Sequence, residues 1–85
     1  TRWKALQELD TTIILYESPF RLLKCLSEIK SYLGEDRLVC VAREISKIYE
    51  EIKTFPVGDM ITYYTAKPSI KGEIVVVIGR KDLER

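Results

Sequence analysis

The stretch EIVVVI at residues 73–78 decides the fold of this 85-residue chain. Five β-branched apolar residues follow one another in it, and Gly72 stands directly before it. Such a run predicts a strand in the middle of a sheet, with apolar neighbours on both of its faces. Gly72 permits the backbone a tight entry into this strand.

A helix and an edge strand are predicted before this run. Pro56 opens the helix, whose apolar face carries residues at helical spacing, namely Val57, Met60, Ile61 and Tyr64. Lys67 and Pro68 end it. In residues 49–54, charged side chains interrupt the apolar positions, which is typical of an exposed edge strand that resists pairing with another chain.

Two further strands are predicted nearer the start of the chain. Residues 37–43 are apolar on both sides and therefore predict a central strand, which a hairpin at residues 44–48 joins to the edge strand. Residues 12–16 form a short β-branched run, predicted to be a strand buried on both faces.

Two helices complete the pattern. The first is short and spans residues 2–9. The second begins at Ser18 and Pro19, ends at Gly34 in a left-handed conformation, and carries one apolar face made of Leu22, Leu26, Ile29 and Leu33.

The predicted order is therefore α-β-α-β-β-α-β. A strand-helix-strand unit makes the first two strands parallel through a right-handed crossover, and the hairpin reverses the third. From pattern alone, the default for β-α-β-β-α-β is a ferredoxin-like sheet with strand order 4-1-3-2, which names no function.

Composition predicts one globular domain over residues 1–85. Apolar residues make up 46% of the chain and charged residues 32%. The net charge of +1 gives no general attraction to nucleic acid or membrane, so any RNA contact must come from a local patch. The longest apolar stretches, residues 13–16 and 74–78, are too short to span a bilayer, and no signal peptide is visible.

The reactive side chains argue against a self-contained enzyme. The chain has no histidine, which removes the commonest general base and zinc ligand, so we assign no catalytic base and no metal site. Cys25 and Cys40 occupy apolar positions and are expected to be unpaired thiols in a cytoplasmic protein. Because the first residue is Thr1, we expect a piece of a longer chain that completes a site formed with another domain.

Three blocks carry a resemblance to a known family: YESPFRLL at residues 16–23, AREISKIYEE at 42–51 and KGEIVVV at 71–77. In this order and spacing they resemble the C-terminal domain of ribosomal RNA small-subunit methyltransferase I, in the tetrapyrrole methylase superfamily, from about residue 9 to residue 79. Phe20 and Tyr49 stand where many relatives have histidine, and residues 53–56 lack the Arg-Gly of the family. These departures leave the exact substrate open.

The resemblance implies the C-terminal half of a two-domain, S-adenosylmethionine-dependent methyltransferase. Such enzymes methylate the ribose 2′-hydroxyl of a cytidine in small-subunit ribosomal RNA. Relatives imply a homodimer and an N-terminal domain that holds much of the methyl donor. The fragment alone is expected to be inactive, with at best weak donor binding.

The resemblance also implies an α/β (α+β) fold built on a mixed four-stranded sheet with helices packed on it. Its strand order is 1-4-2-3, because the last strand inserts between the first two, and a further edge strand precedes residue 1. The strand ends at Glu17, Arg43 and Glu73 would then meet at one end of the sheet, where ligands of open sheets bind.

Site roles follow from the resemblance. The residues that would line the donor pocket are Tyr16, Glu17, Ala42, Arg43, Gly72, Glu73 and Ile74. Those that would face substrate RNA phosphates are Arg21, Arg43, Lys47 and Lys71.

Each role has a structural alternative. Tyr16 and Ile74 would then be core residues, Ala42 would be small because a helix crosses it, and the lysines would only be solvated. Glu17 would be the solvated partner of an arginine, and Arg43 would form a salt bridge with Glu17 or Glu73.

Two other functions stay open. One is a methylase of the same superfamily that acts on a tetrapyrrole or a modified protein side chain. The other is a stand-alone ferredoxin-like module for RNA binding or protein interaction. The strand order separates the ferredoxin-like module from the methylase half.

Overall fold

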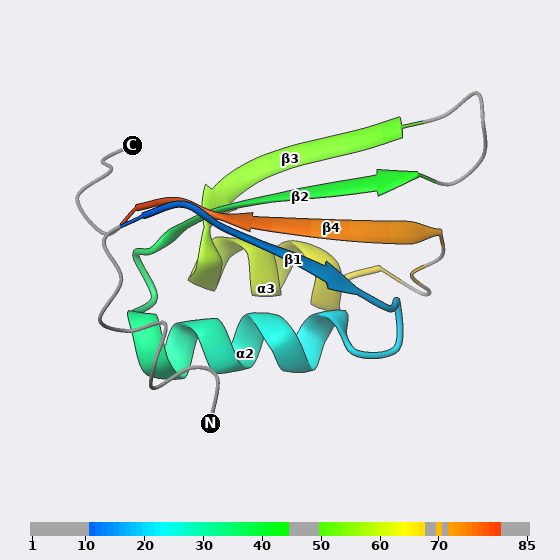
Figure 1. Cartoon of the computed structure of the whole chain (residues 1–85). Helices are drawn as coiled ribbons and strands as arrows, with labels where there is room; N and C mark the ends of the chain where they lie inside the picture. Colours follow the sequence, from blue (N-terminus) through cyan, green and yellow to red (C-terminus); the bar gives the residue numbers. More distant parts are fainter. Residues whose placement is uncertain (1–10, 45–49, 68–69, 71, 81–85) are drawn as a thin grey trace.

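A computed structural model of the chain describes residues 11–44, 50–67, 70 and 72–80. Its elements follow the predicted order (Figure 1): β1 (Ile13–Glu17), α2 (Leu22–Leu33), β2 (Leu38–Glu44), β3 (Glu50–Pro56), α3 (Val57–Thr65) and β4 (Glu73–Ile78). The fold is of the α+β class, as predicted. The expected helix at residues 2–9 and the turn at 45–48 lie outside the described residues.

The four strands form one sheet in the order β1-β4-β2-β3. This confirms the predicted order and the central positions of β4 and β2, and it excludes the ferredoxin-like arrangement for the described sheet. Strands β1 and β2 run parallel to each other, as predicted, but β4 lies between them and runs the opposite way. Every neighbouring pair is consequently antiparallel, whereas a mixed sheet was expected.

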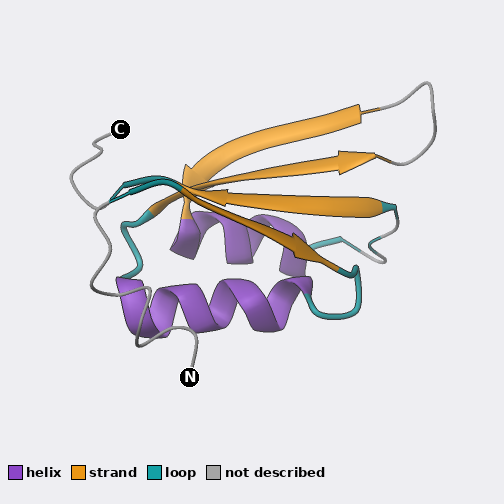
Figure 2. Cartoon of the chain, in the orientation of Figure 1, coloured by secondary structure: helices purple, strands orange, loops and turns teal. Residues whose placement is uncertain are grey.

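Both described helices pack on one face of the sheet (Figure 2). The core between the layers holds alternate residues of the strands and the apolar faces of the helices: Ile13, Val39, Val41, Ile74, Val76 and Ile78 from the sheet, and Leu22, Cys25, Leu26, Ile29, Val57, Met60 and Tyr64 from the helices. The predicted helical faces are therefore the ones that are buried, apart from Leu33 and Ile61, which are half-buried. Burying these side chains is what holds the two layers together.

The other face of the sheet has no cover among the described residues. Ile14, Tyr16 and Ile52 point to this face and are 58%, 80% and 62% exposed. The expectation that β1 is buried on both faces was therefore wrong. A continuous apolar run indicates that both faces are apolar, but it does not say whether a second layer of described structure covers them.

The ends of α2 differ from the prediction. The helix starts after Arg21 rather than at Ser18, because Ser18 and Arg21 close a turn in which the Arg21 N–H donates to the Ser18 carbonyl over 3.0 Å. At the other end, Gly34 has the predicted positive φ, but its ψ of 149° is extended rather than left-handed helical. Pro56 precedes the first residue of α3, as predicted.

Neither described helix has the length and apolarity needed to cross a bilayer. Cys25 is buried in α2, Cys40 is half-buried in β2, and the two form no disulfide.

Candidate functional site

Three chain segments meet at one end of the sheet, as the strand order predicts. In the register, both Glu17 at the end of β1 and Arg43 near the end of β2 are partners of Ile74 in β4. Glu44 is the partner of Glu73. The three sequence blocks that carry the family resemblance are therefore neighbours in space.

The described residues form two shallow hollows at this end, and Glu73 lines both of them. One has a volume of about 350 Å³ and is lined by Tyr16, Glu17, Ser18, Pro19, Gly72, Glu73 and Ile74. The other has a volume of about 220 Å³ and is lined by Ala42, Arg43, Glu44, Ile52, Glu73 and Val75. All seven residues named from the sequence as donor contacts therefore line one of two adjoining hollows.

The larger hollow combines an exposed ring, a buried carboxylate and a glycine. Tyr16 is 80% exposed and so is not a core residue. The carboxylate of Glu17 is buried and lies 3.5 Å from Nε of Arg21, so its partner is an arginine, but the carboxylate is not solvated. Gly72 has a φ of 98°, which allows the tight entry into β4. Ile74 is buried in the core and also lines the hollow.

The smaller hollow lies partly on the uncovered face of the sheet. Ala42, Ile52 and Val75 are neighbours there in the register and give it an apolar floor. Glu44 and Glu73, both exposed, stand directly opposite each other at its end. An apolar floor beside carboxylates suits a ligand that carries both a flat apolar group and a positive charge.

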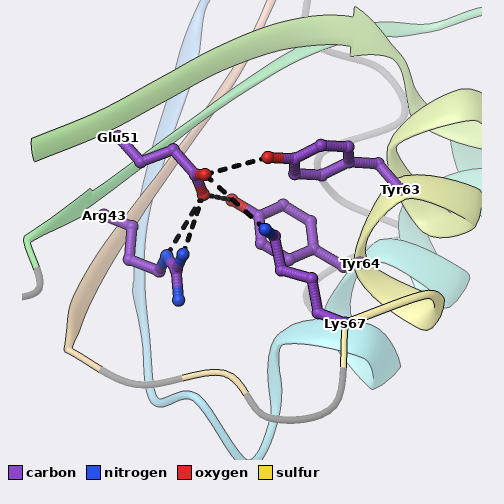
Figure 3. A network of polar contacts seen from close by, with 5 residues as sticks. All are labelled: Arg43, Glu51, Tyr63, Tyr64 and Lys67. Atoms are coloured by element: carbon purple, nitrogen blue, oxygen red, sulfur yellow. Dashed lines mark hydrogen bonds and ion pairs between the residues drawn. The ribbon is translucent and has the colours of Figure 1, made fainter.

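Arg43 takes part in a network of polar contacts on the helix side of the sheet (Figure 3). Its Nη2 and Nε lie 3.1 Å and 3.2 Å from Oε1 of Glu51. The hydroxyls of Tyr63 and Tyr64 donate to the same carboxylate over 2.8 Å and 3.2 Å, and the Lys67 ammonium lies 3.7 Å away. The predicted salt-bridge partners of Arg43, Glu17 and Glu73, were therefore wrong, and the partner the structure gives is Glu51 on the adjacent strand.

The network shifts the pKa of two of its members. Burial raises the pKa of Glu51, but the hydrogen bonds from Tyr63 and Tyr64 and the charges of Arg43 and Lys67 outweigh this and hold it below its ordinary value. For Tyr64, burial is the largest cause and the charge and hydrogen bond of Glu51 follow, and together they raise the pKa of its phenol. At neutral pH, Glu51 is therefore ionised and Tyr64 is neutral.

The two described cations that were named as RNA contacts differ in exposure and in the carboxylate that each one contacts. Arg21 is exposed and lies against Glu17, whereas the side chain of Arg43 is buried against Glu51. Lys47 and Lys71 lie outside the described residues.

Two other cations, not named from the sequence, lie over the ring of Tyr63. The Lys67 ammonium is 4.6 Å from the ring centre, and that of Lys53 is 5.7 Å away. The sequence offered a signal for Lys53, since a charge in an edge strand stood out, but that charge was interpreted as protection against strand pairing. Across the described ranges, no three His, Cys, Asp or Glu side chains converge as metal ligands would.

Comparison with known proteins finds relatives that share one name. The chain is 38% identical over 79 residues to "Ribosomal RNA small subunit methyltransferase I" of Mesorhizobium japonicum, and the match covers 93% of this chain and 27% of the relative. The protein of the same name from Escherichia coli O157:H7 is 40% identical over 95% of this chain and 29% of its own length, and that from Thermotoga maritima is 37% identical over 93% and 35%. No protein-family model matches the chain.

These comparisons confirm the resemblance inferred from the three sequence blocks. The chain spans about a third or less of the length of these relatives.

Proposed function

We propose that the chain forms the C-terminal half of a two-domain, S-adenosylmethionine-dependent methyltransferase that methylates the ribose 2′-hydroxyl of a cytidine in small-subunit ribosomal RNA. One observation supports this most directly. Seven residues from three separate chain segments, chosen for their resemblance to such enzymes, line two adjoining hollows at the strand ends of one sheet. Loops and strand ends on a rigid sheet are where open α/β-type sheets place their ligands.

The residues present fit the methyl donor chemically. The apolar floor of Ala42, Ile52 and Val75 would pack against the adenine ring, and the exposed carboxylate of Glu73 would face the positive charges of the donor. Tyr16 and the buried carboxylate of Glu17 would form the adjoining wall. When bound, S-adenosylmethionine supplies a methyl group on a sulfonium centre.

The part of this chain in the reaction would be positioning. A rigid wall orients the donor, excludes water and so aligns it with the attacking hydroxyl, which is a large share of the work in a displacement of this kind. The Glu51 network supports that wall, because it fixes the buried side chain of Arg43 beside the smaller hollow. The second wall would come from an N-terminal domain, in a cytoplasmic homodimer that acts on the small ribosomal subunit.

The alternatives receive less support. The strand order excludes the ferredoxin-like module for the described sheet. The names of the relatives favour ribosomal RNA over a tetrapyrrole or a protein side chain as the substrate.

The test is a pair of substitutions on one face of β2, made in the longer protein that contains this chain. Ala42→Leu fills the smaller hollow, whereas Cys40→Leu adds bulk two residues away, where neither hollow reaches. We expect Ala42→Leu to weaken donor binding in calorimetry, and methyl transfer to small-subunit RNA, by roughly ten-fold or more, which corresponds to about 1.4 kcal/mol. Cys40→Leu should leave both unchanged, and both variants should keep the melting temperature of the wild type.

Two results would contradict the proposal. One is the absence of methyl transfer by the longer protein to small-subunit RNA. The other is an equal effect of the two substitutions. The 85 residues alone should not bind S-adenosylmethionine with micromolar affinity, because the second wall is missing from them.

A further inference from the structure

We propose that Lys53, Tyr63 and Lys67, here called the β3–α3 patch, form a docking surface for the phosphate backbone of RNA. This rests on the proposed function, because it assigns part of the RNA substrate to a specific surface. The patch lies where the edge strand β3 meets the C-terminal end of α3.

The patch has an excess of positive charge. Among the described contacts, three cations lie around the carboxylate of Glu51, directly or through the ring of Tyr63: Arg43, Lys53 and Lys67. The Lys53 ammonium lies 5.7 Å from the centre of the Tyr63 ring, and the Lys67 ammonium lies 4.6 Å from it. The distance between the two ammonium groups is therefore at most the sum of these two distances. An anion that approaches this ring would therefore be attracted by two positive charges at once.

Contacts with neighbouring side chains hold the Tyr63 ring of the patch in place. The hydroxyl of Tyr63 donates to Glu51 over 2.8 Å, and its ring centre lies 5.6 Å from that of Phe55 and 5.0 Å from that of Tyr64. The ring therefore has a fixed orientation, and it orients the lysines through cation–π contacts. Both lysines are half-buried, with the Lys67 side chain 26% exposed, so part of each side chain remains open to an anion.

The chemistry favours the RNA backbone over its bases. A lysine ammonium group is a point charge and lacks the fixed, two-donor geometry of an arginine guanidinium. Lysines therefore bind the phosphates of any nucleotide sequence. The ring of Tyr63 already packs against Phe55, Tyr64 and the two lysines, so it is not offered to a stacking base.

The position suits a substrate contact. Arg43 lines the smaller hollow and binds Glu51, which in turn contacts Tyr63 and Lys67. One shared carboxylate therefore connects the patch to the candidate donor site. A backbone held on the patch would place a neighbouring nucleoside toward the strand ends.

The experiment is an NMR titration of the isotope-labelled chain at low salt. The probes are an RNA hairpin, a polyglutamate peptide of equal charge, and inorganic phosphate. The patch variant carries Lys53→Gln and Lys67→Gln. The matched control carries Lys24→Gln and Lys30→Gln, which remove the same charge from exposed positions on α2.

We expect the hairpin to shift the amide signals of Lys53, Tyr63 and Lys67. The slope of log affinity against log salt should become shallower by about 1 to 2 in the patch variant and stay unchanged in the control, because roughly one counterion is released per phosphate contact. Equal weakening by the control, shifts confined to other residues, or equal affinity for polyglutamate or free phosphate would each overturn the proposal.

The titration uses neither methyl donor nor methyl transfer. A failure here therefore refutes the β3–α3 patch and leaves the methyltransferase proposal to its own test. An inactive longer protein would refute the methyltransferase proposal without changing the titration.

Discussion

Arg43 and Glu51 are direct cross-strand partners, and their side chains form an ion pair with Nη2 3.1 Å from Oε1. Arg43 is only 7% exposed, and this carboxylate compensates its buried charge. The same carboxylate accepts hydrogen bonds from Tyr63 and Tyr64 of α3. Glu51 therefore joins β2, β3 and α3 next to the candidate site.

Glu51→Gln should destabilise the chain by about 1–3 kcal/mol, because it removes the negative charge that pairs with the buried Arg43 guanidinium while nearly preserving the size of the side chain. Urea unfolding followed by circular dichroism measures this loss. The control is Glu44→Gln, on the same sheet but exposed, which should change the free energy of unfolding by less than about 0.5 kcal/mol. If both substitutions lower the free energy of unfolding by the same amount, the network does not stabilise the fold.

The same carboxylate predicts a loss of stability in acid. The folded pKa of Glu51 is lowered, so the unfolded chain binds a proton more readily than the folded chain. The contribution of Glu51 is therefore fully present above its unfolded pKa, near 4.5, and is lost as the pH falls through the lower folded value. Between pH 6 and roughly 3, Glu51→Gln should unfold with a shallower pH dependence than the wild type, and parallel curves would contradict the assignment.

Tyr64→Phe should change how the stability of the chain depends on pH at the alkaline end of the range. Burial, followed by the charge and hydrogen bond of Glu51, raises the folded pKa of the Tyr64 phenol. Its contribution to stability is present below the unfolded pKa, near 10, and is lost as the pH rises beyond it. The phenylalanine variant should lack this decline and should lose about 1 kcal/mol at neutral pH with its hydrogen bond.

Ultraviolet absorbance of the phenolate, recorded together with unfolding, checks the Tyr64 prediction. Tyr16→Phe, on an 80% exposed ring, should leave the free energy of unfolding and its decline at high pH unchanged. Ionisation of Tyr64 in the folded chain at the pH of an ordinary tyrosine would contradict the prediction.

The strands and their central or edge positions could be predicted because they depend on patterns along the chain, whereas the strand order came from the family resemblance. The β-branched run of β4 marks a central strand, and the charges in β3 mark an edge, as the structure confirms. The shared end of Glu17, Arg43 and Glu73 followed from strand direction once the order was taken from the family resemblance.

Side-chain partners and surface cover could not be predicted in the same way. The sequence suggested Glu17 or Glu73 as the partner of Arg43, whereas the register of β2 with β3 places Glu51 directly opposite it. The exposure of Tyr16 depends on which face the helices cover, and both faces of an apolar strand have the same residue pattern. The lysines over Tyr63 come together only when α3 packs beside β3.

Two glycines provide an internal comparison of backbone strain with helix propensity. Gly34 has φ 98° and ψ 149°, a region that is essentially closed to other residues, and an added Cβ would meet nothing within 4 Å. Gly58 lies inside α3, where an added Cβ would make an ordinary contact with Glu35 at 3.5 Å.

Gly34→Ala should therefore destabilise the chain by about 1–3 kcal/mol through backbone conformation alone. Gly58→Ala should stabilise it by about 0.5–1 kcal/mol through helix propensity, because the Gly58 N–H keeps its hydrogen bond to the Glu35 carbonyl at 3.0 Å. Urea unfolding of the two variants under the same conditions measures the change in the free energy of unfolding for each, and the two changes should have opposite signs. If Gly34→Ala is neutral, the connection from α2 to β2 does not require a positive φ, and the placement of β2 relative to the helices must be revised.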